Sequence, residues 1–236
     1  MKPLVLLAVN FLRQHRWPVL LLFAWIVFMA LATADFGRSR PIPADIVFYA
    51  QQQAIYICIF SAFLAANAIH AERKSRRILL LLSRAVSRAQ YVSAIVSATW
   101  TLAIGCAVVF ALCAEWLAAD AGLPSPGLWL LVMPVAAGAL VAAAASMFFS
   151  TFCNPYLAIA FTLALFCTPA VWHLDRHAWS TWLPGFPLLL QFLKFRFAPD
   201  WAPNWIAIIA ALLQSVVFWG LAVAAFERRD IAVPVE

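Results

Sequence analysis

The stretch "LWLLVMPVAAGALVAAAASMFFS", residues 128–150, contains no charged residue from its first position to its last. An α-helix of about 20 apolar residues crosses the hydrocarbon core of a bilayer, which is roughly 30 Å thick. Hydrophobic residues make up 66% of the 236 positions and charged residues only 11%. Soluble domains contain roughly a quarter charged residues. The sequence therefore predicts an all-α integral membrane protein.

Six stretches of the chain are predicted to span the membrane. They cover residues 17–34, 46–70, 91–117, 128–150, 157–173 and 205–226. The fifth stretch is the shortest. The breaks between them are short and contain Pro and Gly, and no strong internal repeat is present. We therefore expect a single transmembrane domain over residues 1–236, folded as a six-helix bundle.

The N-terminal region allows two interpretations. Basic residues precede an apolar run that ends in Ala32-Thr33-Ala34, a small-x-small pattern typical of a cleaved signal peptide. That run is long for a signal peptide, however, and residues 3–12 form another apolar segment ahead of the basic residues. We favour a spanning helix that is preceded by a helix lying in the membrane interface.

Lys and Arg residues are distributed unevenly between the predicted loops. With the N-terminus in the cytoplasm, eleven of the 16 face the cytoplasm, including the six between residues 71 and 91. Five would face outward: Arg38, Arg40, Arg176, Lys194 and Arg196. Cytoplasmic loops of membrane proteins are enriched in Lys and Arg. Both termini and the basic loop are therefore predicted to be cytoplasmic.

Residues 179–204 form the most unusual connection. Within them, "PGFPLLLQFLKF", residues 184–195, is apolar but too short to span, and prolines and tryptophans flank it. A plain extracellular loop is one interpretation. We favour a re-entrant or interfacial pair of short helices on the outer face.

Motifs of enzymes and nucleic-acid-binding proteins are absent from the sequence. There is no GxxxxGK[ST] phosphate loop, no HExxH and no nucleophile elbow, so we expect no catalytic site in this chain. The net charge of +6 is explained by topology, and no nucleic-acid partner is expected. His173, Asp175 and His177 suit a metal ion in principle, but a solvated outer loop explains them better. The five cysteines lie in apolar runs without a CxxC pair and are interpreted as packing residues.

Polar residues inside the predicted spans are few. Ser97, Thr101 and Glu115 share one helix face and are candidates for a substrate path, although Glu115 also fits the wet end of a helix beside Trp116. Two rows of small residues follow a four-residue period and predict packing between neighbouring helices. The rows are Ser93, Ser97, Thr101 and Gly105, and then Gly138, Ala142, Ser146 and Ser150. Asn67 and His70 could bind a partner or cap a helix.

The loop "AERKSRRILLLLSRAVSRAQY", residues 71–91, combines basic residues with an aliphatic centre. Helical spacing groups Ile78, Leu81, Leu82 and Ala85 on one face. Such a loop can serve only as a topology signal that contacts anionic lipid. Because of its aliphatic face, we expect a short helix on the inner membrane surface that is presented to a soluble partner.

This loop resembles the one between the second and third spans of type-2 ATP-binding-cassette (ABC) exporter permeases. Their pattern is a Glu, then Gly-Thr, a Leu-rich turn and a Ser-x-Pro-hydrophobic-Ser-Arg close. The residues in register with it are Glu72, Leu80, Leu81, Leu82, Ser83, Val86, Ser87 and Arg88. Arg76 and Arg77 replace the Gly-Thr, and Ala85 replaces the Pro. The six spans, the N-terminal interfacial segment, the outer re-entrant region and the terminal "FERRDI", residues 226–231, are similar to that family too.

The resemblance implies a permease subunit in a bacterial cytoplasmic (inner) membrane. It would pair with a second permease copy, as a homodimer or heterodimer, and with separate ATPase subunits that hold ATP and Mg, so that this chain needs no cofactor. The loop would be the coupling helix that docks on the ATPase, through Glu72, Arg76, Arg77, Ile78, Leu79, Leu81, Leu82 and Ser83. The alternative is a stand-alone secondary carrier or membrane scaffold, which predicts carboxylates at mid-membrane or broken helices. The sequence shows neither.

Overall fold

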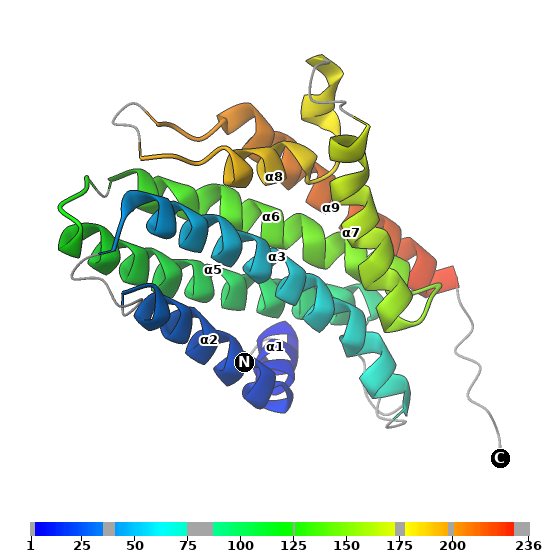
Figure 1. Cartoon of the computed structure of the whole chain (residues 1–236). Coiled ribbons are helices and arrows are strands. Elements are labelled where there is room, and N and C mark those ends of the chain that lie inside the picture. The colour runs from blue at the N-terminus through cyan, green and yellow to red at the C-terminus, as the bar shows by residue number, and fades with distance from the viewer. Residues whose placement is uncertain are drawn as a thin grey trace.

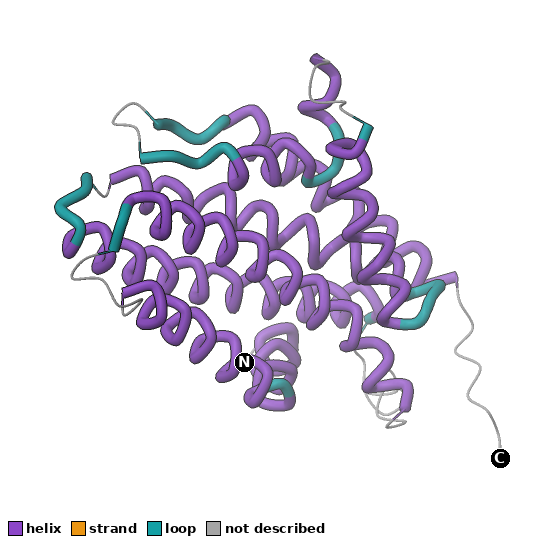
Figure 2. The backbone as a smooth tube through the Cα atoms, in the orientation of Figure 1, coloured by secondary structure: helices purple, strands orange, loops and turns teal. Residues whose placement is uncertain are grey.

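The computed structural model describes residues 3–34, 41–74, 87–124, 126–172, 178–197 and 201–228. Over these residues the chain is helical, and no strand occurs among them (Figure 2). Within the described ranges, five helices are long and apolar enough to cross a membrane. They are α2 (Arg16–Ala34), α3 (Pro43–Lys74), α5 (Arg88–Asp120), α6 (Pro126–Ser150) and α9 (Trp205–Arg228). The prediction of an all-α, multi-pass membrane protein is confirmed at this level.

The predicted span 157–173 corresponds to α7 (Pro155–Val171), which is shorter than the other five. Its 17 residues extend about 26 Å at helical rise, less than the roughly 30 Å of a hydrocarbon core. The count of six spans therefore stays a prediction. Nevertheless, α6 and α9 both run in the same direction along the bundle (Figure 1). The chain between them must return from one end of the bundle to the other.

The bundle has two ends, and a different pair of helices meets at each. At the α3–α5 end, α3 ends and α5 begins; at the α5–α6 end, α5 ends and α6 begins (Figure 1). One core cluster joins Leu128 of α6 to Ala207 of α9 on the α5–α6 side. The other joins Met147 of α6 to Ala222 of α9 on the α3–α5 side. Helices α6 and α9 therefore connect the same two ends as α5 does.

Helix α6 is the centre of the bundle and packs against α3, α5 and α9. Its contact with α3 is close because small residues line it. The Ser146 hydroxyl donates a hydrogen bond of 2.8 Å to the carbonyl oxygen of Ala62. A Cβ added to Gly138 would lie 3.1 Å from Cys58 Sγ. The row of small residues predicted on α6 is thus a helix-packing surface.

The N-terminal segment forms a separate helix, α1 (Pro3–Gln14), as expected for an interfacial element. It packs mainly on α5 rather than continuing α2. Phe11 is buried in the core cluster that also contains Tyr91, whereas Val5 and Leu6 are exposed. One side of α1 therefore holds it to the bundle, and apolar side chains on the other side are free to enter lipid.

Helix α5 begins earlier than the predicted span 91–117 because Ser87 caps it. The Ser87 hydroxyl accepts a hydrogen bond of 3.1 Å from the Gln90 amide. The Gln90 side-chain oxygen accepts one of 3.2 Å from the Ser87 amide. This capping box satisfies two amides of the first turn and fixes the start of the helix. Helix α3 likewise extends beyond 46–70 at both ends.

The predicted pair of short helices is present between α7 and α9. They are the 3-10 helix η2 (Ala178–Trp182) and α8 (Phe186–Leu193). The eight residues of α8 extend only about 12 Å, too little to span. Phe192 packs against Gly138 of α6, where an added Cβ would lie 3.3 Å from its ring. Thus α8 is part of the bundle, and the interpretation as a plain loop is wrong.

Candidate functional site

The segment predicted to dock an ATPase is anchored at the α3–α5 end. Glu72 belongs to the end of α3, and α5 begins at Arg88. Helices α3 and α5 pack on each other, so both ends of the segment lie at this end of the bundle (Figure 1). The other predicted docking residues lie outside the described residues. They are Arg76, Arg77, Ile78, Leu79, Leu81, Leu82 and Ser83.

Charges differ between the two ends, counting only residues whose side chains are described. The α3–α5 end carries the exposed cations Arg13, Arg16 and Arg228, with one carboxylate, Glu227. The α5–α6 end carries three carboxylates and two cations: Asp45, Glu115, Asp120, Lys194 and Arg196. The first group is net positive and the second is net negative. Under the positive-inside rule this distribution favours the α3–α5 end as the cytoplasmic one, and the orientation stays a prediction.

Ser97 and Thr101, two residues of the predicted substrate path, lie exposed on the outer surface of α5. Each hydroxyl donates to a carbonyl oxygen four residues earlier, Ser97 to Ser93 at 2.6 Å and Thr101 to Ser97 at 2.8 Å. Ser93 in turn accepts a hydrogen bond of 3.0 Å from the indole of Trp219 on α9. The row is therefore a self-satisfied polar stripe on a lipid- or partner-facing surface.

The predicted contact between the two rows of small residues is not found. The α6 row is buried, and it packs on α3 through Ser146 and Gly138. The α5 row faces away from α6, because α5 approaches α6 with a different face. On that face the Trp100 indole donates a hydrogen bond of 3.0 Å to the carbonyl oxygen of Ala136.

Glu115 lies near the end of α5, half-buried beside the start of α6. Its Oε2 accepts a hydrogen bond of 2.9 Å from Trp129 Nε1. Trp116, the next residue, is exposed. Glu115 is roughly 27 Å along α5 from Ser97 at 1.5 Å per residue. The helix-end interpretation fits this position, and the three path residues do not converge on one site.

Asn67 and His70 also fail to form a common site in the described structure. The Asn67 amide donates a hydrogen bond of 2.8 Å to the carbonyl oxygen of Phe63, one turn earlier in α3. His70 is exposed. Asn67 therefore satisfies its own helix, which favours the structural interpretation over a binding role.

The cysteines and the predicted metal ligands form no disulfide or metal site among the described residues. Cys58 and Cys106 are buried as packing residues, and Cys167 is exposed; none of the five cysteines is disulfide-bonded. The predicted alternative ligands, His173, Asp175 and His177, lie outside the described residues. Within those residues no three His, Cys, Asp or Glu side chains gather as a metal site would require.

Two glutamines of α3, Gln51 and Gln53, have structural environments that were not predicted from the sequence. Gln51 Nε2 donates hydrogen bonds to the carbonyl oxygens of Leu193, at 2.9 Å, and Phe195, at 3.4 Å. It thereby ties α3 to the chain that follows α8. Gln53 is fully buried, and neither atom of its amide finds a partner among the described residues. The signal in the sequence is the run "QQQ" inside a predicted span, where burying a polar group is costly.

No protein-family model matches this sequence, and no curated protein matches it either.

Proposed function

We propose that this chain is the transmembrane permease subunit of an ABC transporter, moving its substrate outward with ATP that a separate ATPase subunit hydrolyses. The observation that carries the proposal is the loop of residues 71–91. It places an aliphatic face between basic residues and joins two long helices that meet at the net-positive end of the bundle. In a loop surrounded by water that aliphatic face would be exposed, whereas a partner protein could bury it.

In this proposal the loop is the coupling helix. Burying one Leu or Ile side chain against the ATPase would contribute about 1.5 to 3 kcal/mol. ATP-driven closure of the ATPase pair would then push on the α3–α5 end. The bundle shifts between inward and outward states because each state binds the nucleotide-loaded ATPase pair with a different free energy.

A second permease copy completes the assembly in this proposal. Helices α2 and α9 are the least buried of the five long helices, and both carry many exposed apolar residues. Membrane lipids and a second copy can both cover such surfaces. Apolar surfaces with few charged residues favour a lipid-like, amphipathic or macromolecular substrate over a small ion.

The alternative function is a stand-alone secondary carrier or scaffold. An ion-coupled carrier is expected to hold carboxylates near the middle of the membrane. The four carboxylates whose side chains are described, Asp45, Glu115, Asp120 and Glu227, lie toward the ends of their helices. This distribution favours the permease subunit.

Co-purification tests the proposal. The full chain carrying Leu81→Asp and Leu82→Asp is purified from membranes at the same expression level as the wild type. We expect the wild type to bring an ATPase subunit with it and the double variant to lose that subunit while staying inserted, because the spanning helices and the basic residues are unchanged.

A matched pair of single variants sharpens this test. Leu81→Asp lies on the predicted docking face, whereas Leu80→Asp makes the same chemical change on the opposite side of the predicted helix. Leu81→Asp is expected to weaken ATPase retention more than Leu80→Asp. The proposal is wrong if no ATPase accompanies the wild type, or if the double variant retains both the ATPase and its substrate-stimulated activity.

A further inference from the structure

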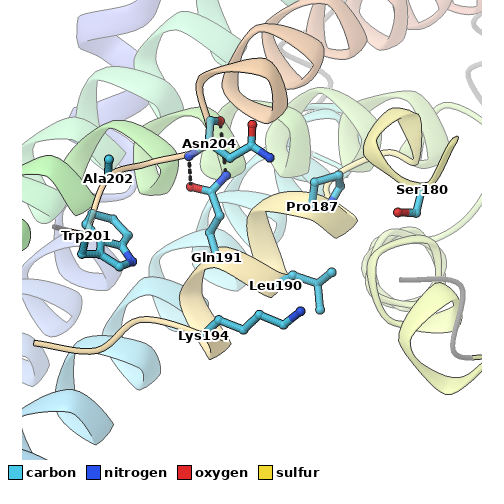
Figure 3. Close-up of a pocket in the computed structure, with 8 residues that line it drawn as sticks. All are labelled: Ser180, Pro187, Leu190, Gln191, Lys194, Trp201, Ala202 and Asn204. Carbon is cyan, nitrogen blue, oxygen red and sulfur yellow. Dashed lines mark hydrogen bonds between the residues drawn. The ribbon is translucent and has the colours of Figure 1, made fainter. Parts of the chain in front are cut away.

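A cavity of about 300 Å³ lies between the end of α8 and the start of α9. Figure 3 shows Lys194 at one side of it, Ser180 across from it, and Trp201 and Asn204 along the chain that leads into α9. Pro187 and Leu190 add an apolar wall. The volume is at the lower end of what small-molecule sites occupy, roughly 300 to 1,000 Å³.

Hydrogen bonds hold one wall of the cavity in place (Figure 3). The Asn204 amide donates to Gln191 Oε1 at 3.1 Å, and Gln191 Nε2 donates to the Asn204 carbonyl oxygen at 3.4 Å. The Asn204 side-chain oxygen accepts a hydrogen bond of 3.2 Å from the Ala207 amide and so caps α9. These bonds use the acceptor atoms of both side chains, and the Asn204 Nδ2 group is left as a donor.

The opposite wall is fixed by an aromatic anchor. Phe195, next to Lys194, is almost completely buried, and its ring meets Trp201 edge to face at 5.1 Å. The Gln51 amide holds the carbonyl oxygen of Leu193 at 2.9 Å. Lys194 therefore extends from a backbone that is held on both sides, and its position does not depend on a free loop.

The side chains of the cavity that remain without a partner can donate hydrogen bonds. The side-chain ammonium of Lys194 has no ion-pair or hydrogen-bond partner among the described residues. Ser180 is only 8% exposed, yet its hydroxyl makes no hydrogen bond there, and the side chain lines the cavity. None of the described residues that line it is acidic. The N-terminus of α9, a 24-residue helix, adds a partial positive charge at the same place.

We propose that this cavity binds a phosphoryl anion. The residues that line it include an ammonium, a hydroxyl and an amide N–H₂, and a phosphoryl group has several acceptor oxygens for such donors. The phosphoryl group belongs to a membrane lipid or is free in solution. The apolar wall and Trp201 favour the lipid, because aromatic side chains of this kind lie at headgroup level. Directly after the cavity, α9 exposes Ile206, Ile209 and Leu213, on which acyl chains can lie.

This site goes beyond the proposed transport function and does not depend on it. A simpler explanation is that Lys194 only extends to the membrane surface, as interfacial lysines do. The two explanations predict different effects of substituting Ser180 and Arg196. Ser180 contributes to binding only if a ligand enters the cavity, whereas Arg196 contributes only if any interfacial cation serves. Arg196 is an exposed cation two residues away that does not line the cavity.

The test uses the purified full chain in a non-ionic detergent. It is titrated with radiolabelled phosphatidylglycerol and, separately, with radiolabelled inorganic phosphate. The variants are Lys194→Gln, Ser180→Ala and the matched control Arg196→Gln. Melting temperatures without ligand establish that all three variants fold.

We expect saturable binding of phosphatidylglycerol that weakens at least about tenfold in Lys194→Gln, because one charge-assisted hydrogen bond is lost. Ser180→Ala is expected to weaken binding as well, and Arg196→Gln to leave it unchanged. Inorganic phosphate that binds with the same variant pattern would identify the free anion as the ligand, and failure of phosphate to bind or compete would identify the lipid. The proposal is overturned if neither probe binds saturably, or if Arg196→Gln weakens binding as much as Lys194→Gln.

Discussion

Gly185 is the residue at which one added methyl group should disturb this structure most. Its φ angle is +67°, a conformation that L-residues rarely adopt, and the Phe166 ring of α7 occupies the place where a Cβ would be. Gly185→Ala is expected to lower the free energy of unfolding by about 2 to 4 kcal/mol, because backbone strain and displacement of the ring add together. Thermal unfolding in detergent, followed by circular dichroism, measures the change.

Two other glycines serve as controls for this prediction. Gly122 has a φ angle of +70°, but an added Cβ would meet no atom within 4 Å, so Gly122→Ala reports the backbone strain alone. Gly220 lies inside α9, and an added Cβ would meet no neighbouring side chain or helix within 4 Å. Gly220→Ala should therefore leave stability unchanged or raise it by up to about 1 kcal/mol. Equal melting temperatures for Gly185→Ala and Gly220→Ala would contradict the described turn between η2 and α8.

The sequence predicts single residues only where local chemistry decides their place. A Pro-Gly pair such as 184–185 is a local signal for a change of chain direction, and Gly185 has the positive φ angle that glycine readily adopts. Glu115 was predicted near a helix end from its distance along α5, and it lies there. Its partner Trp129 follows from tertiary packing, and so do the positions of Gln51 and Lys194. Their environment depends on which helix lies beside them, and that information is absent from local sequence.

At the level of helices, the close contact of α6 with α3 should depend on Gly138. A Cβ at this position would meet Cys58 Sγ at 3.1 Å, which is tighter than ordinary packing. Gly138→Ala is expected to destabilise the protein by about 1 to 3 kcal/mol through overpacking. Cys58→Ala removes the sulfur that a Cβ at position 138 would meet. In a chain that already carries Cys58→Ala, Gly138→Ala should therefore destabilise the protein less than it does in the wild type.

A double-mutant cycle measures this coupling between α6 and α3. Unfolding free energies are determined for the wild type, Gly138→Ala, Cys58→Ala and the double variant. We expect the double variant to be more stable than the sum of the single effects predicts. Strictly additive effects would mean that the two positions do not touch.

Periodicity predicts helices well but does not identify their neighbours. A four-residue period placed Gly138 and Ser146 correctly on a packing face of α6. The same period placed Ser97 and Thr101 against α6, and there the prediction was wrong. A helix as long as α5 meets several neighbours, and small residues on one face do not say which neighbour that face meets. The early start of α5 could have been predicted from the Ser87 and Gln90 spacing of a capping box.

At the scale of the whole molecule, the proposed function depends on which end of the bundle faces the cytoplasm. Composition predicts a multi-pass helical protein, and the structure has five helices of sufficient length. Whether the short α7 counts as a membrane span is harder to predict from length alone. The chain returns from the end of α6 to the start of α9 through both α7 and α8. If the α3–α5 end faced outward, no cytoplasmic ATPase could reach the loop of residues 71–91.

The most direct test is therefore the accessibility of one position from each end of the bundle. Ser75→Cys follows α3 and Ser125→Cys precedes α6; each is labelled in intact cells with a membrane-impermeant maleimide, and again after permeabilisation. The parent chain, whose Cys167 is exposed, gives the background. We predict that Ser125→Cys is labelled in intact cells and Ser75→Cys only after permeabilisation. Labelling of Ser75→Cys in intact cells would contradict the orientation and, with it, the proposed docking of an ATPase.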